Sequence, residues 1–174
     1  MDLSQTIFEL IDMRSFSNLW YWIGLAVMWS TASHWVLGVP WDMVLRARRK
    51  GGQQEDDFEA LTRIYTARMV YIADVSGLAL TSISAFVLTT LAVLGFWYEM
   101  EFAQAVFLMA FPMTLVWSLS LRTARRIRAA DETGPDLHRR MTRHRVTVQV
   151  IGTVSIFVTA MWGMAQNLSI GVLG

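Results

Sequence analysis

Four long apolar segments alternate with short charged ones along the chain, and this pattern predicts its architecture. The apolar segments cover residues 19–39, 70–98, 102–121 and 146–164, and Asp74 is the only charged residue within them. A helix needs about 20 predominantly apolar residues to cross the hydrocarbon core of a bilayer. We therefore predict an all-α integral membrane protein, in which one membrane domain of residues 1–174 forms a four-transmembrane-helix bundle.

The basic residues predict the orientation of this bundle. Eight arginines lie between residues 122 and 145, and six Lys or Arg lie between residues 46 and 68, which leaves one of the fifteen elsewhere. Short loops rich in Lys and Arg stay in the cytoplasm. Both basic segments are therefore expected on the inner side of a bacterial inner membrane, with the N-terminus and the C-terminus outside, in the periplasm. The acidic first dozen residues do not fit a cleavable signal peptide, so the first span is expected to be retained.

Local signals predict helices outside the spans as well. Residues 4–13 have apolar side chains at helical spacing but cannot span a bilayer, which predicts a short N-terminal interfacial helix. The pair Gly51-Gly52 separates a short basic helix from a second one that begins near Glu55 and continues into the membrane. The third helix is expected to continue to Ala130, and the fourth to start near Pro135, so both have cytoplasmic extensions.

The composition excludes several kinds of chemistry. The chain is 54% apolar and has no cysteine, so it offers no disulfide, no thiolate metal site and no cysteine nucleophile. The arginines are where membrane topology requires them, and they do not indicate binding to nucleic acid. No metal-binding, phosphate-binding or nucleophile motif is present. We predict no catalytic residue and no enzymatic activity.

Two ionisable side chains lie inside predicted spans and are the first candidates for function, because such groups are costly in a membrane. His34 could be an axial haem ligand or a proton relay, with His138 or His144 as the second imidazole. Asp74 could be a proton or cation site. For both residues the alternative to these functional roles is a structural role, in which the two side chains join neighbouring helices.

The structural interpretation is the one we adopt, as a polar layer near the inner ends of the spans. Asp74 would accept a hydrogen bond from His34 or Gln149, while Arg145 lies close enough to keep it ionised. Such a layer would set the register of the helices. Its predicted members are His34, Asp74, Ser118, Gln149 and Arg145.

Small residues recur at every fourth position of the second span, at Ala73, Gly77, Thr81 and Ala85. A stripe of this kind lets another membrane helix approach closely, so we predict a helix contact there. The eight tryptophans are interpreted as anchors at the two membrane interfaces, and stacking on a pigment or quinone is the alternative. No cofactor or metal is predicted beyond these possible haem, quinone or pigment contacts.

The stretches from Phe8 to Trp20, from Ser33 to Pro40 and from Phe102 to Phe107, together with Thr123 to Arg126, resemble a family of small membrane proteins of Rhodobacter-type alphaproteobacteria. Some members of that family are labelled components of the SufBCD iron–sulfur assembly complex. The resemblance implies a bacterial inner membrane. No functional residue follows from it, and a chain without cysteine has no thiolate to bind an iron–sulfur cluster.

A helical bundle without a catalytic constellation is most simply a non-catalytic accessory or assembly subunit. Its expected partners are membrane lipids and the subunits of a larger respiratory or photosynthetic complex. Two alternatives remain open at this point, a b-type haem or quinone-binding electron carrier and a small transporter subunit.

Overall fold

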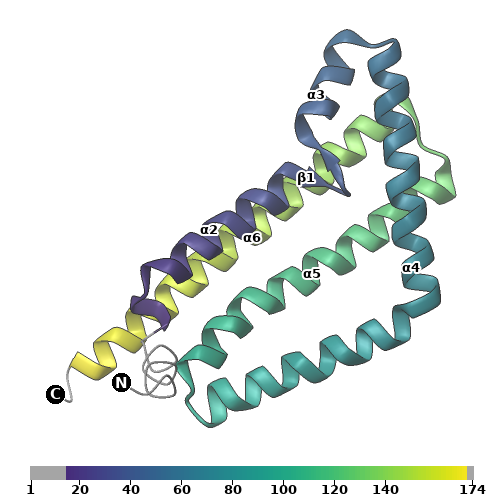
Figure 1. The fold of residues 1–174 in the computed structure, drawn as a ribbon. Coiled ribbons are helices and arrows are strands. Elements are labelled where there is room, and N and C mark those ends of the chain that lie inside the picture. Colours follow the sequence, from purple (N-terminus) through teal and green to yellow (C-terminus); the bar gives the residue numbers. More distant parts are fainter. Residues whose placement is uncertain (1–14, 172–174) are drawn as a thin grey trace, which may run out of the picture.

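The computed structural model describes residues 15–171 of the chain, with side chains up to residue 168. The elements, in order, are η1 Ser15–Ser17, α2 Leu19–His34, β1 Trp35–Val36, β2 Val39–Pro40, α3 Trp41–Lys50, α4 Gln53–Ala92, the π-helical turn η2 Val93–Trp97, α5 Glu101–Ala130 and α6 Gly134–Gly171 (Figure 1). The predicted helical fold is confirmed, as are the extensions of the long helices beyond the apolar segments. The predicted interfacial helix at residues 4–13 lies outside the described residues.

Three helical segments of residues 15–168 are long and apolar enough to cross a membrane. They are Gln53–Trp97, Glu101–Ala130 and Gly134–Leu168; the first of them contains the second predicted span except its last residue, and the other two contain the third and fourth predicted spans. The confirmed part of the architecture is therefore a helical protein with three candidate spans.

The first predicted span, residues 19–39, is not one continuous helix. The helix α2 ends at His34 after 16 residues, and Trp35–Val36 then pairs with Val39–Pro40 in a short antiparallel hairpin. Leu37 and Gly38 form its turn with positive φ angles of 52° and 83°, and a Cβ on Gly38 would lie 2.7 Å from Cδ1 of Tyr65. Sixteen residues of helix are about 24 Å long, less than the hydrocarbon core of a typical bilayer. A fourth crossing therefore stays a prediction.

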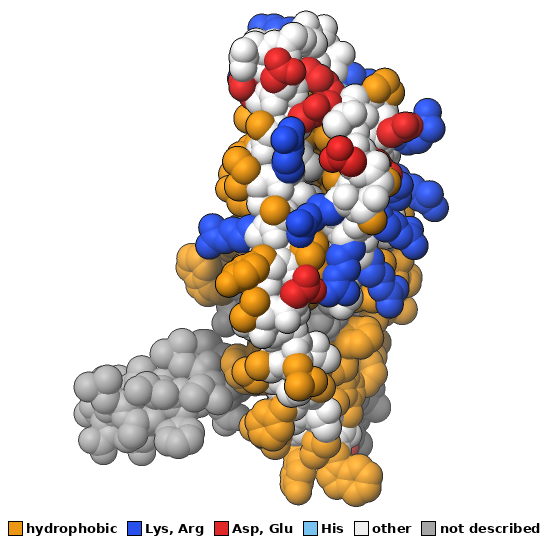
Figure 2. Space-filling view, turned by 90° about the vertical axis from the view of Figure 1, so that its right-hand side faces the viewer, with side chains coloured by type: hydrophobic (Ala, Val, Ile, Leu, Met, Phe, Trp, Pro, Cys, Tyr) orange, Lys and Arg blue, Asp and Glu red, His pale blue; other side chains and the backbone are white. Residues whose placement is uncertain are grey.

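The basic segments and their neighbours, residues 41–69 and 122–145, form what we call the charged end. The hairpin, α3, α4, α5 and α6 all contribute to one apolar core there, and Phe58 and Met141 lie at its centre with no exposed surface. Figure 2 shows acidic and basic side chains gathered over this end and hydrophobic side chains over the other half of the molecule. The charged end is thus a packed unit and not a set of loops.

A second core joins α2, α5 and α6 in the apolar half. It consists of Leu25, Trp29, Val116 and Val148. A Cβ added to Gly152 would lie 2.7 Å from Cε3 of Trp29, so the absence of a side chain on α6 lets α2 lie against it. The apolar part of α4 contributes no residue to this core.

The helix α4 bends along its length, and its second half runs apart from α5 before the turn that joins the two helices (Figure 1). Ser76-Gly77 contains the only glycine within α4. Sharp bends in helices without proline commonly occur at Gly/Ser pairs, and this is the pair of that kind in α4. The geometry leaves the middle of α4 away from the rest of the bundle.

Candidate functional site

The middle of α4 is exposed around its whole circumference within the described chain. All ten residues from 78 to 87 are exposed, with Leu78 at 86% and Phe86 at 72%. Ten residues form almost three turns, so the exposure covers the whole circumference of the helix. In the most apolar window of α4 no residue is buried, against 28% in α5 and 22% in α6. We call residues 78–87 the open segment.

The open segment is anchored at the charged end. Phe58, Thr62, Thr66 and Val70 repeat at every fourth position of α4, and all four are buried. One turn further, Asp74 accepts a hydrogen bond from Nη2 of Arg125 at 2.9 Å, which ties α4 to α5. Beyond this ion pair the packed stripe ends.

The other anchor is Gln104, which is 3% exposed. Its Nε2 donates to the carbonyl of Gly95 at 2.8 Å, and its Oε1 accepts from Nε1 of Trp162 at 2.9 Å. A Cβ on Gly95 would lie 2.9 Å from the backbone nitrogen of Gln104, so only glycine fits this contact. One buried amide therefore joins η2, α5 and α6, and α4 is held on both sides of the open segment.

The predicted small-residue stripe runs into the open segment. Ala73 and Gly77 are half-buried, whereas Thr81 and Ala85 are exposed. A Cβ on Gly77 would meet no atom within 4 Å. No close neighbour of Gly77 is therefore found among the described residues, and the helix contact predicted from the stripe stays a prediction.

Hydroxyl groups in the open segment also differ from those elsewhere in the same helix. Near the charged end, Thr62 and Thr66 donate to backbone carbonyls four residues earlier, at 2.8 and 2.7 Å. The described structure contains no side-chain hydrogen bond for Thr81, Ser82 or Ser84. Their hydroxyls are free to bond to a group outside the chain.

The structure gives the members of the predicted polar layer separate partners. Asp74 binds Arg125 and not His34 or Gln149, because α5 lies between α4 and α6. His34 Nε2 lies 4.0 Å from Asp42, and Arg145 donates to the carbonyl of Ser33 at 3.1 Å. The two remaining members bond within their own helices. The hydroxyl of Ser118 donates to the backbone carbonyl of Thr114, and the backbone carbonyl of Gln149 accepts from the hydroxyl of Thr153.

The three histidines lie in three different environments. His34 is exposed beside Asp42, His138 binds Glu55, and His144 is buried with its ring nitrogens 3.1 and 3.2 Å from the hydroxyls of Ser120 and Thr123. Within the described residues, no group of three or more His, Asp or Glu side chains could hold a metal ion. The possible pairing of His34 with a second imidazole has no support in these contacts.

Two glycines of α6 form the close approaches that sequence reasoning had placed on α4. Gly152 faces the ring of Trp29, and a Cβ on Gly163 would lie 3.2 Å from Cβ of Phe16. They are eleven residues apart, which is close to three helical turns, so both lie on the face toward α2 and η1. The spacing of these two glycines could have predicted a helix contact from the sequence, but two glycines are weaker evidence for such a contact than four small residues at every fourth position. Gln104 had no such signal, since a single amide in an apolar run does not show which helices it joins.

Comparison with known proteins identifies no relative of this chain. No family model, no curated protein and no solved structure matches it. The resemblance to small alphaproteobacterial membrane proteins therefore stays a prediction, and the function has to be argued from the chain's own residues.

Proposed function

We propose that the protein is a non-catalytic accessory or assembly subunit, and that a transmembrane helix of a larger inner-membrane complex, respiratory or photosynthetic, packs against α4. In this proposal the chain crosses the membrane four times, with its charged end in the cytoplasm and both termini outside. The observation that carries it is the open segment, which is exposed on every face between two anchored ends.

The chemistry of α4 favours a protein helix over lipid chains as the occupant. Lipid tails gain nothing from small side chains, whereas a helix can approach the backbone closely at Gly77 and Ala85. The hydroxyl of Thr81 lies on the same face, four residues from each, where it can bond across the contact. A partner helix with small or hydrogen-bonding side chains fits this face.

Photo-crosslinking in native membranes tests the proposal. A photoreactive residue replaces Thr81 or Ala85 on the stripe, and Ile83, which points to the opposite side of the same helix about 200° away, is the matched control. We expect one adduct of discrete mass from Thr81 and Ala85, none from Ile83, and loss of that adduct when Gly77→Leu is added.

Other results would count against the proposal. Equal crosslinking at Thr81 and Ile83, or lipid adducts alone, would mean that the open segment faces lipid. An adduct of twice the chain's mass would assign the stripe to a second copy of this protein and overturn the proposed larger complex. Retention of the adduct in Gly77→Leu would show that the stripe is not the contact.

A further inference from the structure

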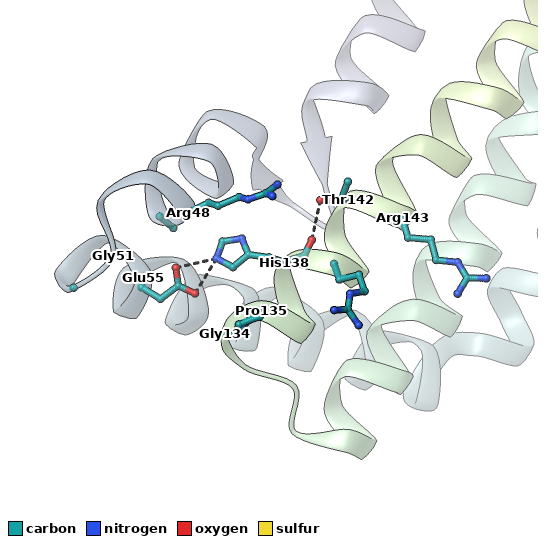
Figure 3. A pocket seen from close by; sticks show the side chains of 11 residues that line it. Arg48, Gly51, Glu55, Gly134, Pro135, His138, Thr142 and Arg143 are labelled. Atoms are coloured by element: carbon teal, nitrogen blue, oxygen red, sulfur yellow. Dashed lines mark hydrogen bonds and ion pairs between the residues drawn. The ribbon is translucent and has the colours of Figure 1, made fainter.

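A cavity of about 830 Å³ lies at the charged end, away from the open segment. It is bounded by the last turn of α3, the first turn of α4 and the first turns of α6 (Figure 3). Its size is in the range of small-molecule sites. Three arginines from two helices line it: Arg48 on α3, and Arg139 and Arg143 on α6.

These arginines carry positive charge that the described residues do not neutralise. Arg48 and Arg143 take part in none of the ion pairs of the described chain. Arg139 lies 3.8 Å from Asp136, and both side chains are more than three-quarters exposed, so that pair is weak. The cavity therefore has an excess of cationic donors.

The only acid that lines the cavity is already occupied. Both carboxylate oxygens of Glu55 lie 2.9 Å from Nε2 of His138. The His138 ring is held in place by stacking on Phe58, with 4.9 Å between the ring centroids. Figure 3 shows Arg48 extending over this pair from α3, while Arg143 extends along α6 away from it. Of these two arginines, Arg48 is thus the one that reaches over the Glu55–His138 pair.

The backbone around the arginines also favours an anion. The helix α4 begins at the cavity wall, where Gly51-Gly52 precede its first turn. At the start of α6, by contrast, the Gly134 N–H already donates to Oε1 of Glu59 at 2.7 Å, and Pro135 has no N–H. The first N–H groups of a helix lack partners within it, and its N-terminus is the positive end of the dipole. No side chain caps α4, and a Cβ on Gly51 or Gly52 would meet no atom within 4 Å. An anion can therefore approach this backbone closely.

The position along α6 indicates which anion is at hand. Arg143 lies two residues before Arg145, whose guanidinium sits 4.4 Å above the ring of Trp41. The uncharged run of α6 begins directly afterwards, at Val146. Tryptophan and arginine at the end of an apolar run are typical of the headgroup region of a membrane. Arg143 is three residues before Val146, about 4.5 Å along the helix, so this edge of the cavity is within reach of lipid headgroups.

We propose that this cavity binds a phosphate group, supplied by the headgroup of an anionic phospholipid, with Arg48 and Arg139 as its main ligands. Guanidinium groups match phosphate oxygens in a two-pronged geometry, and basic pockets at the inner ends of membrane helices bind such headgroups. The inference is independent of the proposed partner of α4, because no residue of the open segment lines the cavity.

The test uses the full chain in nanodiscs of phosphatidylcholine, with or without a minor fraction of phosphatidylglycerol, and native mass spectrometry to count retained lipids. Arg48→Gln is compared with Arg49→Gln, which removes the same charge from an exposed neighbour that does not line the cavity. We expect Arg48→Gln to weaken retention of phosphatidylglycerol about fivefold and Arg49→Gln to leave it unchanged. Circular dichroism checks that both variants keep their helix content.

A third arm adds inorganic phosphate to phosphatidylcholine nanodiscs and follows thermal unfolding. Stabilisation by phosphate that Arg48→Gln removes, without any preference for phosphatidylglycerol, would keep the phosphate site but assign it to a soluble ligand in place of a lipid. Equal losses in Arg48→Gln and Arg49→Gln would overturn the site in favour of general attraction to a charged surface. Absence of any preference for either probe would also overturn it.

Discussion

The two halves of α4 follow the same four-residue spacing and have opposite environments. In the half at the charged end, Phe58, Thr62, Thr66 and Val70 form a buried stripe against α3, α5 and α6. In the other half, Gly77, Thr81 and Ala85 repeat that spacing one residue out of register; Thr81 and Ala85 are exposed, and a Cβ on Gly77 would meet no atom within 4 Å. The difference lies in the side chains that can fill space: an aromatic ring and a valine occupy the first stripe, and small residues the second.

A four-residue period in the sequence therefore identifies one face of a helix, but it does not indicate what packs against that face. A large apolar side chain among charged ones is stable only when it is buried within the chain, because exposing apolar surface to water is unfavourable. Inside a membrane that pressure is absent, since lipid is as apolar as leucine. A stripe of small residues in a membrane can therefore stay exposed to lipid at little cost in free energy until a partner helix binds. The stripe in the first half of α4 cannot stay exposed to water at a similarly small cost.

The largest expected effect concerns the side of the membrane on which the charged end and the opposite end of the molecule lie. The chain has no cysteine, so Ser17→Cys and Lys50→Cys each create a single labelling site, the first just before α2 and the second at the end of α3. A membrane-impermeant thiol reagent is applied to cells in which only the outer membrane has been made permeable, so that it reaches the periplasm and not the cytoplasm. We expect this reagent to label Ser17→Cys and not Lys50→Cys, because basic segments stay in the cytoplasm. Labelling of both sites would mean that α2 does not cross the membrane. Labelling of Lys50→Cys alone would invert the topology.

The second test makes the same change in each half of α4. Phe58→Ala empties a fully buried site and should lower the free energy of unfolding by about 3–5 kcal/mol. Phe86→Ala, at a ring that is 72% exposed, should change the purified chain by less than about 0.5 kcal/mol. Thermal unfolding in detergent with circular dichroism measures both. Similar losses in the two variants would refute the contrast between the halves.

A third pair of variants compares Gly77 of α4, which has free space around it, with Gly152 of α6, which packs against another helix. Gly152→Ala should lower stability by about 1–3 kcal/mol, since its new methyl group would overlap the ring of Trp29. Gly77→Ala has free space around it and should raise the stability of the isolated chain by about 0.5–1 kcal/mol, as expected for glycine in a helix. The same unfolding assay applies. A loss of stability in Gly77→Ala would show that α4 packs within its own chain after all.

The smallest expected effect is at the boundary of the two halves. Asp74 and Arg125 are 59% and 53% exposed in their side chains, so their pair should contribute only about 0.2–1 kcal/mol. A double-mutant cycle with Asp74→Asn and Arg125→Gln measures this coupling in the same unfolding assay. A value several times larger would mean that the pair is shielded from water, as in the predicted polar layer. No coupling would leave Phe58 and its neighbours as the anchor.

Much of the fold followed from the sequence because membrane physics leaves few choices. Uncharged runs of bilayer length and paired glycines at Gly51-Gly52 were enough to predict the long helices, their extensions and the break before α4. The end of α2 at His34 was missed because the hairpin depends on the close contact between Gly38 and Tyr65, residues far apart in the chain. The candidate site was found only in part: the stripe with Gly77 was visible, but not its exposure.

Composition and spacing alone determined which segments are apolar, which are basic, and which helix faces carry small residues, because hydropathy and helical period are properties of local sequence. Tertiary structure alone decided that Asp74 pairs with Arg125, that Gly152 receives Trp29, and that arginines from α3 and α6 share a cavity with Glu55 and His138. Each of these depends on which helices are neighbours. In an apolar bundle many helix orders bury similar surface, and only the close fit of particular side chains selects among them.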